Sequence, residues 1–79
     1  MIQDQAIAQQ VSDRLLQVNG ALDEAIVFVQ DNCSAIEIQA FKRAMGEIMY
    51  KVFEEALIPI YKEHPILVPE GLRVSGITD

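Results

Sequence analysis

Apolar residues in the first third of the chain recur at alternating steps of three and four positions. The row consists of Ala8, Val11, Leu15, Val18, Leu22, Ala25 and Val29. Steps of three and four place residues on one side of an α-helix, and a row sustained over three heptads is typical of a helix that packs lengthwise against another helix. The pattern therefore predicts one long helix over residues 4–31.

The dipeptide Asn19-Gly20 is the one signal within this segment that favours a turn. A break at this point would give three helices instead of two. However, Val18 and Leu22 share a face only if the helix continues through Gly20, and a glycine inside a helix costs only about 1 kcal/mol. We therefore predict that the first helix is continuous.

A second helix is predicted over residues 35–58, after a polar turn at residues 31–34. Ser34 and Glu37 have the S-x-x-E spacing of a capping box, in which each residue bonds the backbone N–H of the other. Apolar residues then continue the three-four spacing and broaden to about half of the helix surface. They are Ile38, Phe41, Met45, Ile48, Met49, Val52, Phe53, Ala56, Leu57 and Ile60.

Prolines dominate the end of the chain. Pro59 cannot donate a hydrogen bond and disfavours α geometry at Ile58, so we expect the second helix to end there or to continue with a kink to about Glu63. Pro65 should stop any continuation. The tail, residues 65–79, has no helical period but is too apolar for a linker, so it is predicted to run extended, as a strap over the surface near Phe53 and Leu57 of its own chain or of the dimer partner. The alternative is a segment that binds another protein.

The predicted fold class is therefore all-α. A single domain, residues 1–79, forms a two-helix antiparallel hairpin with an irregular C-terminal tail. A hairpin cannot cover the broad apolar face of its second helix, and a 79-residue chain has a marginal core. We expect dimerisation to complete a four-helix bundle. The candidate interface residues are Leu16, Val27, Phe28, Met45, Met49, Phe53 and Leu57.

The charge and composition exclude several classes of partner. The formal net charge is −6, with six basic residues, which disfavours binding to nucleic acid. No apolar run approaches the roughly 18 residues that a membrane span needs, so no membrane partner is expected. The absence of a secretory signal and the single cysteine favour a cytoplasmic location.

The sequence offers no convergent set of catalytic or metal-binding groups. Cys33 and His64 are the only cysteine and the only histidine, and the hairpin separates them by about 40 Å, at 1.5 Å per residue. The adjacent acidic pairs Asp23-Glu24 and Glu54-Glu55 point to different sides of their helices. We therefore expect no catalytic residues, no metal site and no cofactor.

No motif identifies a biological role, so the functional hypotheses rest on shape. The first is a non-enzymatic protein–protein interaction module, acting as a homodimeric helical bundle. The alternative is a heteromeric regulator that docks on a larger protein, such as an inhibitor, an immunity or antitoxin-type protein, or an adaptor. A carrier that encloses an apolar ligand at the dimer interface, next to Met45 and Met49, is a third hypothesis.

Overall fold

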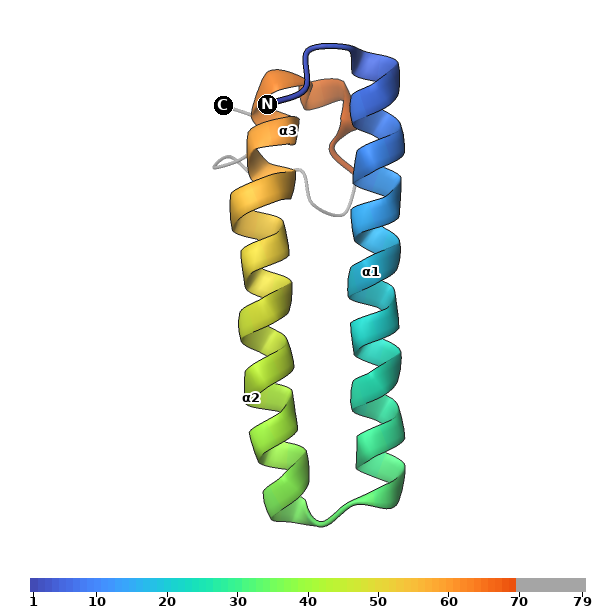
Figure 1. The fold of residues 1–79 in the computed structure, drawn as a ribbon, viewed down its shortest axis with the longest axis vertical. Helices are drawn as coiled ribbons and strands as arrows, with labels where there is room; N and C mark the ends of the chain where they lie inside the picture. Colours follow the sequence, from blue (N-terminus) through green and yellow to red (C-terminus); the bar gives the residue numbers. More distant parts are fainter. Residues whose placement is uncertain (70–79) are drawn as a thin grey trace.

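The computed structural model describes residues 1–69, and every regular element in this range is helical. Two long helices, α1 (Gln5–Asn32) and α2 (Ala35–Lys51), lie antiparallel side by side (Figure 1). A π-helical segment, η1 (Val52–Leu57), continues α2 into the short helix α3 (Ile58–Glu63). A 3-10 turn, η2 (Pro65–Leu67), follows. The predicted all-α hairpin is confirmed.

Helix α1 runs through Gly20 without a break, as predicted. No described glycine has a positive φ, so Gly20 does not act as a helix cap. The helix begins where the Asp4 side chain accepts a hydrogen bond from the Ile7 N–H at 3.0 Å. At the other end, the Asn32 side-chain amide donates to the Phe28 carbonyl at 2.8 Å. Side chains at both ends thus satisfy backbone groups that the helix itself leaves unpaired.

Replacing Gly20 with Ala is expected to stabilise the protein by up to about 1 kcal/mol, because Ala loses less backbone entropy and is the better helix former. A Cβ at this position would meet no atom within 4 Å, so no steric cost opposes the gain. Urea unfolding followed by circular dichroism measures the difference. A lower unfolding midpoint for Gly20→Ala would contradict a continuous helix.

The predicted capping box at the start of α2 is confirmed. The Ser34 N–H donates to the Glu37 carboxylate at 3.0 Å, and the Glu37 N–H donates to Ser34 Oγ at 3.3 Å. Hydrogen bonds from the Ser34 backbone and hydroxyl favour the charged carboxylate, and so they lower the pKa of Glu37. The box fixes where the chain reverses, and with it the antiparallel alignment of the two helices.

The rotation of α1 about its axis differs from the predicted one. Ala8, Leu15, Leu22 and Val29 form a row of buried or half-buried residues, as expected. Next to this row, Ser12 is buried and the Asn19 side-chain oxygen is inaccessible, whereas Val18 is exposed. The predicted placement of Val18 in the seam was therefore wrong. A hydrogen bond of 2.9 Å between Ser12 Oγ and Tyr61 Oη turns the Ser12 side of α1 inward.

The π-helical segment η1 lies directly before Pro59. The Ile58 N–H donates to the Phe53 carbonyl, five residues back, instead of to a carbonyl four residues back. This change in the backbone hydrogen bonds makes room near the Glu55 carbonyl, which a proline at position 59 would crowd in a regular α-helix. Ile58 keeps α geometry, with φ −59° and ψ −47°, so the expected displacement of this residue was wrong. Helical structure continues to Glu63, as the kinked alternative predicted.

The core lies at the end of the hairpin away from the turn, which we call the closed end. Its fully buried apolar residues are Ala8, Leu57, Ile60, Tyr61 and Val68. The wider π turn rotates the residues that follow it, and this rotation brings Leu57, Ile60 and Tyr61 to the side that faces α1. The sequence-based helix phase did not include this shift.

The N-terminal residues fold over the closed end. The Ile2 carbonyl lies 2.6 Å from Nε2 of the buried His64 side chain, and the Met1 ammonium forms an ion pair of 3.0 Å with Glu63. This interaction lowers the pKa of the Glu63 carboxyl. The chain start and the end of α3 are thereby joined.

The first part of the tail packs on the core, as the strap prediction requires. Val68 is buried and Leu67 contacts the core residues. The tail begins with a helical turn at Pro65, not with an extended run, because a proline is readily accommodated in the first turn of a helix. The rest of the predicted strap, residues 70–79, lies outside the described residues.

Candidate interaction surface

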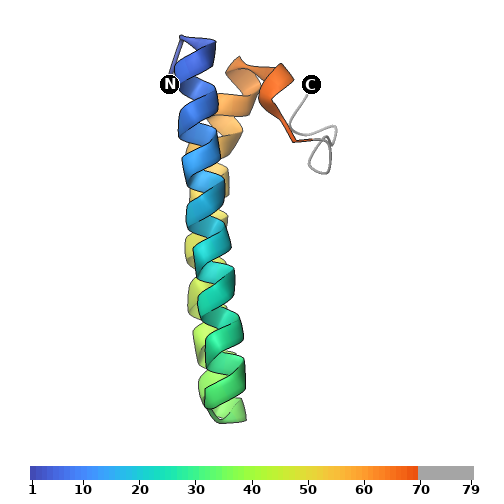
Figure 2. The ribbon, with the colours of Figure 1, turned by 90° about the vertical axis from the view of Figure 1, so that its right-hand side faces the viewer.

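The two-helix layer has two broad faces, and residues 65–69 lie over one of them at the closed end. In Figure 2, η2 lies to one side of the layer. Leu16 and Ser12 of α1 line a shallow depression together with Leu67 and Pro69. This side of α1 is therefore occupied at the closed end by the chain itself.

The opposite face is apolar, and within the part of the chain that the structure describes, neither η2 nor residues 68–69 lie over it. On a helix, the residues three and four positions after a given residue lie to opposite sides of it. Val18 and Ala25, three positions after Leu15 and Leu22, therefore lie on the side of α1 away from Asn19. Phe41 and Ile48 flank Met45 of α2 in the same way. Antiparallel packing brings these two flanks to one face of the layer.

We call this surface the open face. It consists of Val18, Ala21, Ala25 and Phe28 of α1 and of Phe41, Ala44 and Ile48 of α2, and Ile7 and Val11 extend it toward the closed end. Val18 is 46% exposed and Phe28 is 68% exposed, although both are apolar. A contiguous apolar surface of this kind on so small a chain is typical of a protein-binding site.

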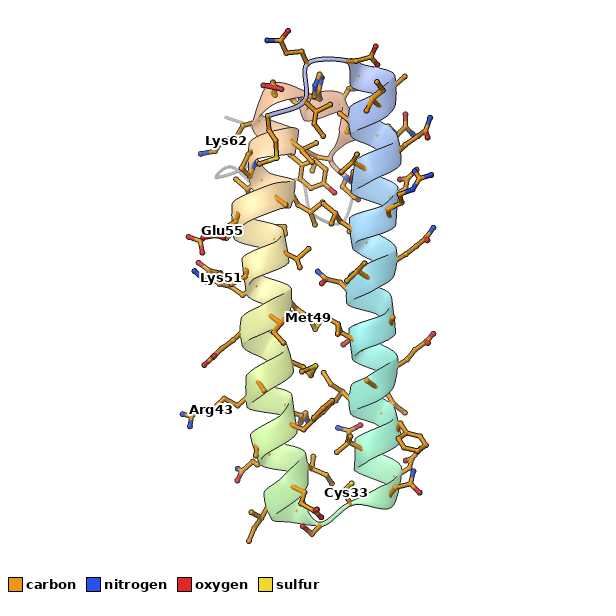
Figure 3. All side chains as sticks on the ribbon, in the orientation of Figure 1. Cys33, Arg43, Met49, Lys51, Glu55 and Lys62 are labelled. Atoms are coloured by element: carbon orange, nitrogen blue, oxygen red, sulfur yellow. The ribbon has the colours of Figure 1, made fainter. Side chains whose placement is uncertain are left out.

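Most charged side chains along the edges of this face lie in the closed-end half. Lys51 and Glu55 form an exposed ion pair of 3.5 Å on the outer side of the second helix (Figure 3). On α1, the exposed Arg14 donates to the Gln10 backbone carbonyl at 3.2 Å and to Gln10 Oε1 at 3.5 Å. Toward the turn, Glu37 is the one charged residue beside this face, and its carboxylate accepts hydrogen bonds from the Ser34 N–H and hydroxyl. The turn half of the face thus has fewer charged side chains beside it than the closed-end half.

One polar atom interrupts the seam between the helices. The Asn19 side-chain oxygen is inaccessible and has no hydrogen-bond partner among residues 1–69. A buried carbonyl without a partner costs about 1–3 kcal/mol. An amide in an apolar helix seam disfavours shifted alignments, because a shift would bury the same group elsewhere without a partner.

The structure separates the candidate interface residues that the sequence predicted. Leu57 is fully buried in the core of its own chain, so it is not available to a partner in this structure. Leu16 and Phe53 pack against the same core, and Met45 and Met49 are half-buried. Val27 and Phe28 are exposed, but they point to different sides of α1, and only Phe28 belongs to the open face.

Sequence reasoning missed most of the open face. The sequence does contain a pattern that indicates this face. It is a second apolar row in α1 with the same three-four spacing, shifted by one position from the row that begins at Ala8. This row consists of Ile7, Val11, Val18, Ala21, Ala25 and Phe28, with Arg14 as its one charged member. Val11, Val18 and Ala25 fit both rows, and in the prediction they were assigned to the seam.

The groups considered for chemistry do not converge. Cys33 is exposed at the turn (Figure 3), and His64 is buried at the closed end of a molecule that is 44 Å long. Within residues 1–69, no group of three or more histidine, cysteine or acidic side chains could hold a metal ion.

None of the helices in residues 1–69 combines the length and the apolar character needed to span a bilayer. No protein-family model, curated protein or solved structure matches the chain.

Proposed function

We propose that this chain is a non-enzymatic protein–protein interaction module that works as a homodimeric helical bundle. The main support for this proposal is the exposure of α2. This helix has 17 residues, and none of them is buried in the single chain. Phe41, Met45 and Met49 are only half-buried, although each belongs to a side-chain type that is normally found in protein cores. A second hairpin laid on this layer would cover them.

The size of the chain supports the same proposal. Small domains of this length bury only about 60% of the surface that their unfolded chains expose, and many gain the missing stability from a partner subunit. Here the fully buried apolar residues gather at the closed end, and about half the length of the hairpin has no core of its own. Two copies would build one continuous core, as in other four-helix bundles.

Light scattering coupled to size-exclusion chromatography tests the proposal. At micromolar concentration we expect a mass of twice 8.8 kDa, and we expect the melting temperature to rise with protein concentration, because dimerisation stabilises the folded state by mass action. A monomer mass combined with a concentration-independent melting temperature would contradict a homodimer.

A specific observation also favours the alternative, a heteromeric regulator. Ile36 is 82% exposed and lines a shallow depression with Gln39, Ala40 and Arg43 on α2, away from the open face. A homodimer through the open face would leave this apolar residue in water. Purification of the tagged chain from its native host distinguishes the two: a stoichiometric second protein, retained by the wild type and lost with Ile36→Glu, would favour the regulator.

The single exposed cysteine, Cys33, is compatible with a reducing compartment, so a cytoplasmic location belongs to the same proposal. A fusion to a fluorescent protein, imaged in the native host, would test this part separately from the assembly.

A further inference from the structure

We infer that a second copy of this chain packs on the open face, aligned so that both turns lie at the same end of the bundle. This inference rests on the proposed homodimer and adds the face and the orientation. The twofold axis would run parallel to the helices, and α1 of one copy would pack against α2 of the other. Every helix would then be antiparallel to both of its neighbours.

The choice of face follows from the position of residues 65–69. The Ser12 side of the layer already carries η2 and residues 68–69, which would hold a second flat layer away from the helices there (Figure 2). Among residues 1–69, no segment after α3 lies over the open face. A stable, specific dimer could form only where two layers approach along their whole length, which leaves the open face.

A broad side of the layer is large enough for a stable dimer. The described residues span 44 × 23 × 20 Å, and the two helices lie side by side when viewed along the shortest axis (Figure 1), so a broad side of the layer measures about 1,000 Å² before its side-chain relief is counted. Specific protein interfaces bury about 800 Å² on each partner. One copy is therefore large enough to cover the other without contributions from a further protein.

The orientation follows from the uneven distribution of charge. The turn half of the open face contains Phe28, Phe41 and Ile48, with Glu37 as the one charged residue beside them, and the Glu37 carboxylate is held by Ser34; the closed-end half is bordered by Arg14, Lys51 and Glu55. Aligned copies would place one apolar half on the other. Reversed copies would place Phe28 and Phe41 against the charged half and would desolvate these charges without a matching partner.

Aligned copies would also pair opposite charges at the rim. Arg14 and Glu55 both lie about five helical turns from the turn that joins α1 and α2. With α1 packed on the partner's α2, the two residues would lie at the same height. Arg14 would then face the partner's Glu55, an exposed carboxylate whose ion-pair partner in its own chain, Lys51, is also exposed. Such a rim pair contributes little affinity but favours one orientation.

The native Cys33 allows the orientation to be measured in the unaltered full-length chain. Cys33 is the only cysteine and is exposed at the turn, so a nitroxide label attached to it reports the distance between the two turns by electron double resonance. Neighbouring helices in a bundle lie about 8–10 Å apart, so aligned copies should give a label separation of roughly 15–30 Å. A separation close to the 44 Å length of the molecule would overturn the alignment.

A valine-to-glutamate substitution, made at one position on the open face and at one position outside it, tests whether the dimer forms through this face. Val18 and Val27 are exposed valines of α1, at 46% and 54%, and only Val18 lies on the open face. Val18→Glu should convert the dimer to a monomer, with at least a tenfold loss of dimer affinity, and Val27→Glu should leave the dimer mass unchanged. Circular dichroism of both variants confirms that they remain helical.

The outcomes separate this inference from the proposed function. A dimeric wild type that stays dimeric with Val18→Glu would overturn the open face while the homodimer stands. A dimer with a long distance between labels would overturn only the alignment. A wild-type monomer that gives no dipolar signal would overturn both the inference and the proposed homodimer.

Discussion

Replacing Leu57 with Ala is expected to lower the free energy of unfolding by about 2–5 kcal/mol. Leu57 is fully buried among Ile60, Tyr61 and Val68, so the truncated side chain would leave a cavity that its neighbours fill only in part. A chain of this size has a total stability of roughly 4–12 kcal/mol. The loss should therefore be visible as a large drop in the urea midpoint and could unfold the chain at 37 °C.

The matched control for this prediction is Ile36→Ala. Ile36 is an aliphatic residue in the same hairpin but is 82% exposed, so its truncation should change the unfolding free energy by less than about 0.5 kcal/mol. Both variants should be measured at one protein concentration, because a dimer is stabilised by mass action. Equal effects of the two substitutions would contradict the position of the core at the closed end.

Shortening the chain to end at His64 is expected to cost about 3 kcal/mol relative to a chain that ends at Pro69. The difference consists of η2 and Val68, which is 2% exposed and packs on the core. Burial of one such aliphatic side chain contributes about 1.5–3 kcal/mol, and the half-buried Leu67 adds to this. The loss of these residues would also uncover the Ser12–Tyr61 hydrogen bond.

Thermal unfolding of the two shortened chains measures this contribution directly. Because both chains lack residues 70–79, their difference reports only the contacts of residues 65–69. The chain that ends at Pro69 should melt about 10 °C or more above the other, since 1 kcal/mol corresponds to about 4–8 °C in a domain of this size. Coinciding melting curves would show that the start of the tail is not a strap.

Local patterns in the sequence were sufficient to predict the course of the hairpin. The long three-four row, the Ser34–Glu37 spacing and the low cost of an internal glycine predicted α1 within one residue at each end, and they predicted the start of α2. These signals act within one helix or one turn, so they do not depend on what the element packs against. The stop at Pro65 is of the same kind, because proline acts on its own neighbours.

The candidate surface was predicted only in part, because it depends on helix rotation. Two overlapping apolar rows run along α1, and either could have formed the seam. The sequence-based choice put Val18 inside, whereas the structure has it exposed and buries Ser12. Of the predicted interface residues, Phe28 lies on the open face and Leu57 lies in the core.

The sequence by itself therefore determined the extent of α1, the start of α2 and their antiparallel order, because hydrogen bonds and steric limits between near neighbours decide these. Only the tertiary structure decided which sides of the helices are buried. The Ser12–Tyr61 contact joins residues 49 positions apart and sets the rotation of α1. The π turn before Pro59 shifts the phase of the residues after it and brings Leu57 inward. Contacts between distant residues and a one-residue change in helix phase leave no periodic signal in the sequence, and they determine which face remains open.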